Sequence, residues 1–92
     1  MKITIYDYQK QKRTKTIEAS EKADYEELAK QIAKADWFDL DTMGIFVYNN
    51  LWNMLAIVEF EKRERGVYML VSDLERFEDR ERVAFREWGS GK

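Results

Sequence analysis

Residues 54–60 read MLAIVEF, a run in which only Glu59 carries a charge. The run is apolar on both faces of an extended chain, which is typical of a strand inside a sheet and not at its edge. We therefore expect a strand from Met54 to Glu61 at the centre of the fold. Two further strands are expected at Gly44–Tyr48 and Val67–Ser72. Asn49-Asn50 and Arg65-Gly66 supply the turns that join the three strands.

The first twenty residues predict a hairpin. Ile3 and Ile5 alternate with polar residues, the period-two pattern of a half-buried strand, and residues 15–19 repeat it. We expect Ile5 to pair with Ile17, because a slip of one residue would move one of these side chains into water. This register places Tyr6 and Tyr8 on the face opposite the isoleucines. The tip of the hairpin then consists of Lys10, Gln11 and Lys12.

A helix is expected between the hairpin and the central strands. Asp24 stands three residues before Glu27, the spacing of a capping box, although Ser20 is a competing earlier start. One apolar stripe follows at helical spacing, formed by Tyr25, Leu28, Ala29, Ile32 and Ala33.

The C-terminal third leaves two interpretations open. Ser72 and Glu75 form another capping-box pair, which predicts a second helix towards Trp88. Two residues do not fit its apolar face, since Val83 lies off that face and Glu81 falls in its middle. The rival interpretation is a short helix that ends near Phe77, followed by an edge strand made of RVAFREW. We prefer the long helix for residues 78–88.

These elements predict one α+β domain over residues 1–88 with a flexible tail at 89–92. Ninety-two residues suffice for one hydrophobic core. The expected order is β-β-α-β-β-β-α, with a mixed or antiparallel sheet of about five strands and both helices packed on it.

Residues 1–35 resemble the opening of ubiquitin-like β-grasp proteins. The resemblance rests on the apolar positions Ile3, Ile5, Ile17, Tyr25, Leu28 and Ile32. It implies a β-grasp-like architecture and no particular activity. Covalent tagging is not implied, because the final residues WGSGK lack the paired glycines used for conjugation.

The composition excludes several kinds of chemistry. The chain has no cysteine and no histidine, so it offers no thiol nucleophile, no thiolate metal site and no imidazole base. Neither a glycine-rich phosphate loop nor a nucleophile elbow occurs. We therefore expect a non-catalytic protein without a cofactor or metal. A cytoplasmic location without membrane association is also expected, because no apolar stretch approaches the roughly 20 residues of a membrane span.

The segment DWFDLD and the turn around Trp52 form the first candidate site. Rigid aromatic rings are favoured interface anchors, and an acidic rim would prefer a basic partner. We expect a protein-interaction module, an accessory or inhibitory protein that engages a larger macromolecule such as a nucleic-acid-binding protein. The expected contact residues are Trp37, Phe38, Trp52, Asp36, Asp39 and Asp41. The alternative role for the rings is to close the core. The aspartates lack calcium-loop spacing, so no metal is expected.

The hairpin tip is the second candidate site. Its cations would neutralise phosphates while two tyrosines stacked on bases, which predicts weak nucleic-acid binding. The residues concerned are Tyr6, Tyr8, Lys10, Lys12, Arg13 and Lys15. A solvated turn whose lysines discourage edge-to-edge aggregation explains the same residues. A structural subunit of a larger assembly, recognisable by an exposed apolar patch, is a third possibility.

Overall fold

The MLAIVEF run forms the first seven residues of strand β4 (Met54–Arg63), which lies inside the sheet as predicted. The computed structural model describes residues 1–85. Ala56, Val58 and Phe60 of β4 are buried, and Ile57 on the opposite face is only half-buried. One face of this apolar strand is therefore covered, and the other is not.

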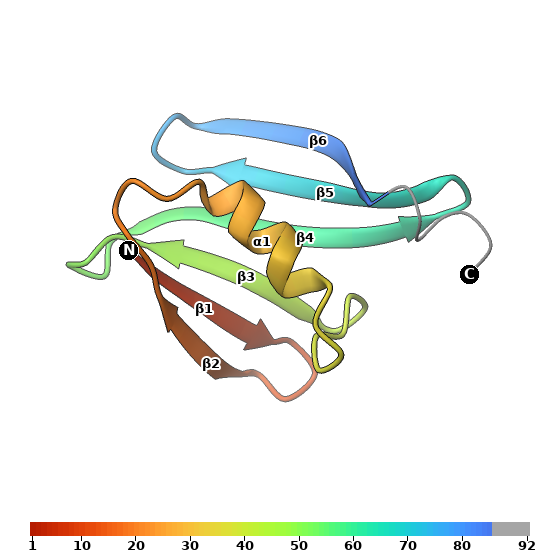
Figure 1. Ribbon diagram of the computed structural model, residues 1–92, viewed down its shortest axis with the longest axis horizontal. Coiled ribbons are helices and arrows are strands. Elements are labelled where there is room, and N and C mark those ends of the chain that lie inside the picture. Colours follow the sequence, from red (N-terminus) through yellow and green to blue (C-terminus); the bar gives the residue numbers. More distant parts are fainter. Residues whose placement is uncertain (86–92) are drawn as a thin grey trace.

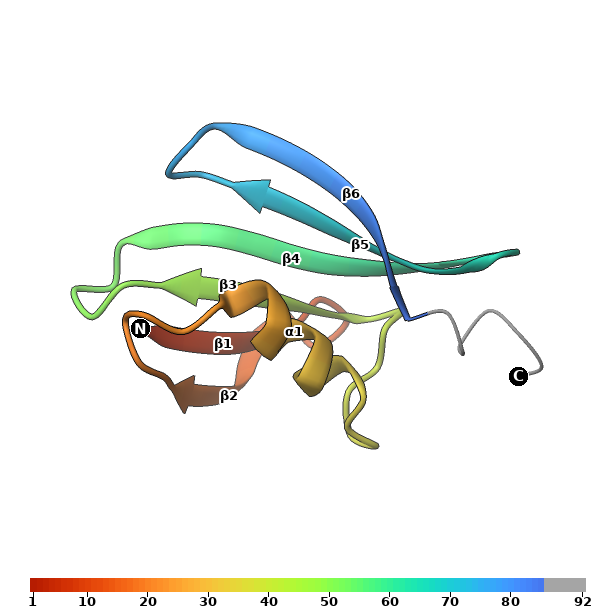
Figure 2. The same cartoon turned by 45° about the horizontal axis from the view of Figure 1, so that its top comes forward.

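Six antiparallel strands make up the sheet, in the order β2-β1-β3-β4-β5-β6 (Figure 1). The one helix of residues 1–85 lies across a single face of it, as Figures 1 and 2 show. The remaining elements are β1 (Lys2–Asp7), β2 (Lys12–Glu18), α1 (Tyr25–Ala33), β3 (Met43–Tyr48), β5 (Gly66–Asp73) and β6 (Glu78–Phe85).

Helix α1 begins where the sequence predicts. The Asp24 carboxylate accepts hydrogen bonds from the backbone N–H groups of Glu26 and Glu27, at 3.0 and 3.4 Å. These bonds satisfy two of the donors that a helix start leaves free. Ala29, Ile32 and Ala33 then point into the core.

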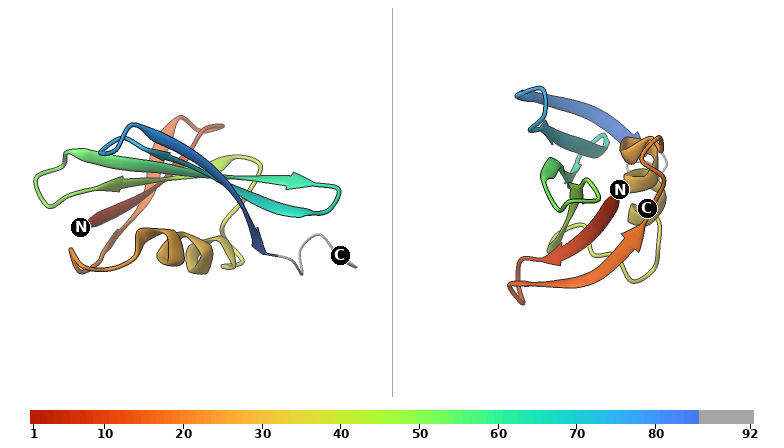
Figure 3. Two further views of the ribbon diagram at one scale, coloured as in Figure 1. Left: turned by 90° about the horizontal axis from the view of Figure 1, so that it is seen from above. Right: turned by 90° about the vertical axis from the view of Figure 1, so that its left-hand side faces the viewer.

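The hydrophobic core lies between α1 and the sheet. Each of its buried aliphatic side chains contributes roughly 1.5–3 kcal/mol relative to exposure. The fully buried strand residues that form it are Ile3, Ile5, Ile45, Val47, Ala56, Val58, Val67, Met69 and Val71. No element of residues 1–85 packs on the other face of the central strands, as the view along the sheet in Figure 3 shows.

The predicted α+β, β-grasp-like fold class is wrong. Residues 1–85 form mainly an antiparallel sheet, with six strands in place of about five and one nine-residue helix in place of two. The helix expected after Ser72 does not form. Ser72 belongs to β5, and residues 74–77 are a tight turn.

Asp73 makes that turn, not Ser72. Its carboxylate accepts the backbone N–H of Arg76 at 3.1 Å, and Phe77 ends the turn with φ of 54°. The chain then runs back as the edge strand β6. The rival interpretation is therefore right about an edge strand and wrong about a short helix before it. Residues 86–88 and the predicted tail at 89–92 lie outside the described residues.

Polar contacts attach β6 to α1. The Glu26 carboxylate lies 2.8 Å from the guanidinium groups of both Arg80 and Arg82. Arg80 also lies 3.5 Å from the Asp73 carboxylate, which accepts the Tyr25 hydroxyl at 3.2 Å. Alternation in β6 thus sends Arg80 and Arg82 to the helix side, and Glu81 and Val83 to the other face. This period of two explains why Glu81 and Val83 do not fit a helical face.

The N-terminal hairpin has a different register from the predicted one. Ile3 pairs with Ile17 and Ile5 with Lys15, with an irregularity between Ile5 and Tyr6. The expected pairing of Ile5 with Ile17 is therefore wrong by two residues. A two-residue slip keeps every side chain on its face, so the hydrophobic pattern cannot distinguish the two registers. The turn occupies residues 8–11, and Lys12 already belongs to β2.

No helix in residues 1–85 combines the length and apolar character needed to cross a membrane.

Candidate interaction surface

Aromatic side chains gather on the face of the sheet that lacks a helix. Tyr6 and Phe46 stack at 5.4 Å between ring centroids with 12° between their planes. Tyr8 meets Tyr6 edge-on at 5.2 Å and lies 6.2 Å from Phe46. We call Tyr6, Tyr8 and Phe46 the ring cluster. Tyr6 and Phe46 are half-buried and Tyr8 is 41% exposed, so the cluster is accessible to a partner.

Strand pairing explains why these residues meet. Phe46 pairs with Thr4 of β1 and with Ile57 of β4, and cross-strand partners share a face. Tyr6 pairs with Gly44, one alternation further along β3. The ring cluster therefore covers the junction of β1 and β3, with Ile57 beside it.

Tyr8 lies directly over Gly44. A Cβ atom built on Gly44 would stand 2.7 Å from the Tyr8 hydroxyl oxygen and 2.9 Å from its Cε2. These distances are below ordinary contact, so the ring needs a residue without a side chain beneath it. The Tyr8 hydroxyl donates a 2.8 Å hydrogen bond to Oε2 of Glu59. Burial and this bond to a carboxylate raise the pKa of Tyr8 well above its ordinary value.

Trp52 lies at one end of this face, in the turn between β3 and β4. Its φ of 63° is unusual for a residue with a side chain and costs of order 1–2 kcal/mol. The conformation folds the ring back to 5.4 Å from Tyr48. The Lys2 ammonium lies 5.1 Å from the Trp52 ring, and the Arg13 guanidinium lies 5.3 Å from the Tyr48 ring. Trp52 thus covers part of the sheet and stays 48% exposed.

Tyr68 marks the opposite side of this face, towards β6. The Arg63 guanidinium lies 4.3 Å from its ring centroid and also bonds two carboxylates, Glu61 at 3.0 Å and Glu81 at 2.8 Å. The bonds to Arg63 lower the pKa of Glu81. Asp79 is one further acid on the same face. It pairs with Ser72, and Ser72 pairs with Ile57, so the three side chains share a face.

The residues of the first predicted site do not form one surface. Trp37 belongs to the segment between α1 and β3, whereas Trp52 belongs to the turn after β3, so the two residues lie in connections at opposite ends of that strand. Phe38 is 7% exposed and packs edge-on against Phe60 at 5.9 Å, which gives it the core-closing role. Trp37 is 42% exposed, with the Lys15 ammonium 4.4 Å from its ring.

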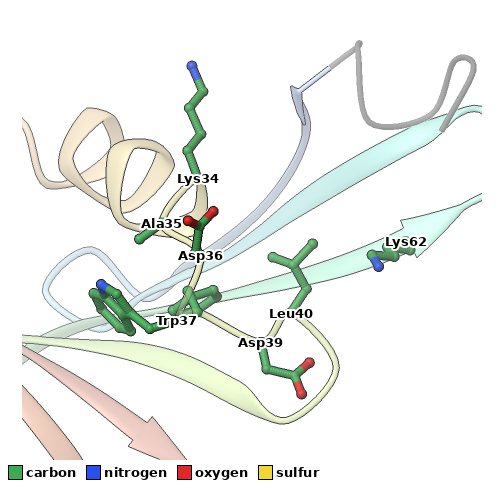
Figure 4. A pocket seen from close by; sticks show the side chains of 8 residues that line it. Lys34, Ala35, Asp36, Trp37, Asp39, Leu40 and Lys62 are labelled. Atoms are coloured by element: carbon green, nitrogen blue, oxygen red, sulfur yellow. The ribbon is translucent and has the colours of Figure 1, made fainter.

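The DWFDLD segment lines a shallow pocket of about 560 Å³ beyond the end of α1 (Figure 4). Asp36, Trp37, Asp39 and Leu40 of this segment border it, and Lys62 of β4 lies further along (Figure 4). Asp39 Oδ1 accepts the backbone N–H of Asp41 at 2.9 Å, so it shapes its own loop. No group of acidic side chains in residues 1–85 is arranged to hold a metal ion.

The residues of the predicted nucleic-acid site are dispersed. Tyr6 and Tyr8 lie on the helix-free face, as expected. Lys15 contacts Trp37 on the helix side, and Arg13 covers Tyr48, where it donates a 3.1 Å hydrogen bond to the hydroxyl. Lys10 lies in the turn and Lys12 opens β2. Arg13 is also the cross-strand partner of Tyr6, so one of the four cations stands beside the tyrosines, while the others lie in the turn, at the start of β2 and on the helix side.

Sequence reasoning missed the residues that complete the ring cluster. These are Gly44, Phe46, Ile57 and Glu59. The one available signal is the apolar character of both faces of the MLAIVEF run, which predicts a strand inside the sheet and does not reveal that one of its faces stays uncovered.

No protein-family model, curated protein or solved structure matches this chain. The resemblance of residues 1–35 to ubiquitin-like proteins accordingly stays a prediction.

Proposed function

We propose that this chain is a small non-catalytic protein-interaction module that binds its partner through the helix-free face of the sheet. One observation carries the proposal. The ring cluster and Ile57 form an aromatic and aliphatic surface over the central strands, and no element of residues 1–85 covers it. Exposed surfaces rich in tyrosine, phenylalanine and tryptophan are typical of protein interfaces.

The charges around this surface favour a protein partner over a nucleic acid. Glu59 bonds Tyr8 at the edge of the ring cluster and Asp79 lies on the same face, while Glu61 and Glu81 are paired with Arg63. Carboxylates at this position repel a phosphate backbone, whereas nucleic-acid sites gather lysine and arginine. They suit a partner with basic side chains, which agrees with an accessory or inhibitory protein that engages a basic macromolecule.

Two features support a non-catalytic role. The sequence has neither histidine nor cysteine. In residues 1–85, burial raises the pKa of Tyr8 and Tyr25, and the Arg63 hydrogen bonds lower that of Glu81. Each shift moves the group further from neutral pH, whereas general acid–base catalysis needs a group that titrates near it.

Affinity capture with matched variants tests the proposal. The bait is the intact chain, applied to a lysate of the source cell, beside Tyr8→Ala and Trp37→Ala. These two rings are exposed to the same extent, 41% and 42%, on opposite faces. We expect a specific protein to be retained by the wild type and by Trp37→Ala and lost with Tyr8→Ala, with purified partner confirming the difference by calorimetry.

Thermal unfolding of each variant controls for loss of the fold. Equal retention by all three chains, loss with Trp37→Ala alone, or no protein retained by the wild type would each contradict the proposed surface. Binding of an oligonucleotide at low salt that Tyr8→Ala abolishes would assign the face to nucleic acid instead.

A further inference from the structure

Cations already cover the rings at both sides of the helix-free face. Lys2 and Arg13 lie over Trp52 and Tyr48, and Arg63 lies over Tyr68. A cation above an aromatic face is attracted by the ring quadrupole, by about 0.5–1 kcal/mol at exposed sites. The protein therefore uses the ring faces on this surface as cation-binding sites.

The ring cluster at the centre differs. No cation of residues 1–85 lies over Tyr6, Tyr8 or Phe46. A carboxylate nevertheless stands beside it, because Glu59 accepts the Tyr8 hydroxyl through Oε2. One hydrogen bond leaves most of the acceptor capacity of a carboxylate unused. The centre of the face thus combines exposed rings with an anionic oxygen, and within the described chain it lacks the cation that the flanking rings have.

We infer that this cluster binds an arginine side chain of the protein partner. The inference rests on the proposed function and specifies the chemistry of the same surface. A planar guanidinium lies flat on an aromatic ring while two of its in-plane N–H groups donate to a carboxylate. An ammonium has neither the plane nor the two-pronged geometry, even where it makes one contact of each kind, as Lys2 does with Trp52 and Glu18.

Arg63 shows the same combination within the chain. It stacks on Tyr68 while donating two 2.8 Å hydrogen bonds to Glu81. At the ring cluster, Tyr6, Tyr8 and Phe46 take the place of Tyr68, and Glu59 takes the place of Glu81. The partner's arginine takes the place of Arg63: it stacks on the ring cluster and donates hydrogen bonds to Glu59.

Peptide titrations of the isotopically labelled full chain test the inference. The probes are acetyl-Ala-Arg-Ala-amide, the same peptide with citrulline, a neutral isostere of arginine, and the same peptide with lysine. We expect the arginine peptide to shift the amide resonances of Tyr8, Phe46 and Glu59 and to bind about fivefold tighter than the citrulline peptide.

Glu59→Gln should remove this preference, whereas Glu75→Gln, an exposed acid of the β5–β6 turn, should leave it unchanged. Equal binding of the arginine and citrulline peptides, equal binding of the lysine peptide, or shifts that map elsewhere would overturn the inference. Concentration-dependent shifts of these residues without peptide would assign the face to a second copy and overturn it as well. The capture experiment with Tyr8→Ala decides the proposed function separately, since a partner can bind the rings without arginine.

Discussion

Gly44→Ala crowds the ring cluster with a single methyl group. The added Cβ would lie 2.7 Å from the Tyr8 hydroxyl oxygen, and ordinary contacts begin at 3.4 Å, so the ring must move outward by about 0.7 Å. Because Tyr8 is a long side chain at the surface, the ring moves and the backbone does not. The 2.8 Å hydrogen bond to Glu59 is then lost.

Two free-energy terms of opposite sign follow from this substitution. A lost hydrogen bond to a partly exposed carboxylate costs about 1 kcal/mol. Replacing glycine inside a strand by alanine regains roughly 0.5–1 kcal/mol, since the unfolded chain has less freedom to lose. The net change in unfolding free energy is therefore expected within about 0.5 kcal/mol of zero.

The pKa of Tyr8 should nevertheless fall towards its ordinary value of 10.0, because the ring leaves Glu59 and becomes more solvated. Alkaline titration of tyrosinate absorbance measures this fall, and urea unfolding measures stability. Tyr8→Phe identifies the transition that belongs to Tyr8. An unchanged titration curve, or destabilisation above about 3 kcal/mol, would refute the reasoning, since either result would mean that the backbone and not the ring gives way.

Three further predictions concern stability, each measured by urea unfolding. Asp24→Ala should destabilise the protein by about 1 kcal/mol, because helix α1 loses its N-cap; a change indistinguishable from zero would mean that packing alone sets the helix start. Phe77→Gly should stabilise it by about 0.5–1 kcal/mol, because Phe77 has φ of 54° and a 93% exposed side chain; destabilisation would show that the ring makes a favourable contact. Stability should be fully present below pH 10.0 and decline above it, because the raised pKa values of Tyr8 and Tyr25 keep both phenols protonated in the folded state while they ionise in the unfolded chain; a decline that Tyr25→Phe and Tyr8→Phe leave unchanged would locate its cause elsewhere.

Local patterns were sufficient for most elements of the fold. The alternation around Ile3, the capping residue Asp24 and the apolar run of β4 each predict their element from neighbouring residues alone. The C-terminal segment is not determined by local pattern, because two adjacent residues, Ser72 and Asp73, both suit the start of a turn and only Asp73 makes it. The contacts that decide for a strand join Glu26 to Arg80 and Arg82, which are far apart in the sequence.

The candidate surface was predictable only in part. Alternation places Tyr6 and Tyr8 opposite the core, as the structure shows. That Phe46 stacks on Tyr6 depends on β3 lying beside β1, and no local pattern reveals the order of strands in a sheet. Trp37 and Trp52 appeared equivalent by residue type, and only their positions at the two ends of β3 separate them.

The ring cluster straddles the single junction in the sheet that joins strands distant in the chain. From β3 to β6 each strand pairs with its sequence neighbour, whereas β1 meets β3 across the whole of β2 and α1. Closing that long loop costs more entropy than forming a local hairpin, so it should be a late event in folding. A nascent or truncated chain would then lack the assembled ring cluster until β1 docks beside β3, so under the proposed function partner binding has to wait for completed folding.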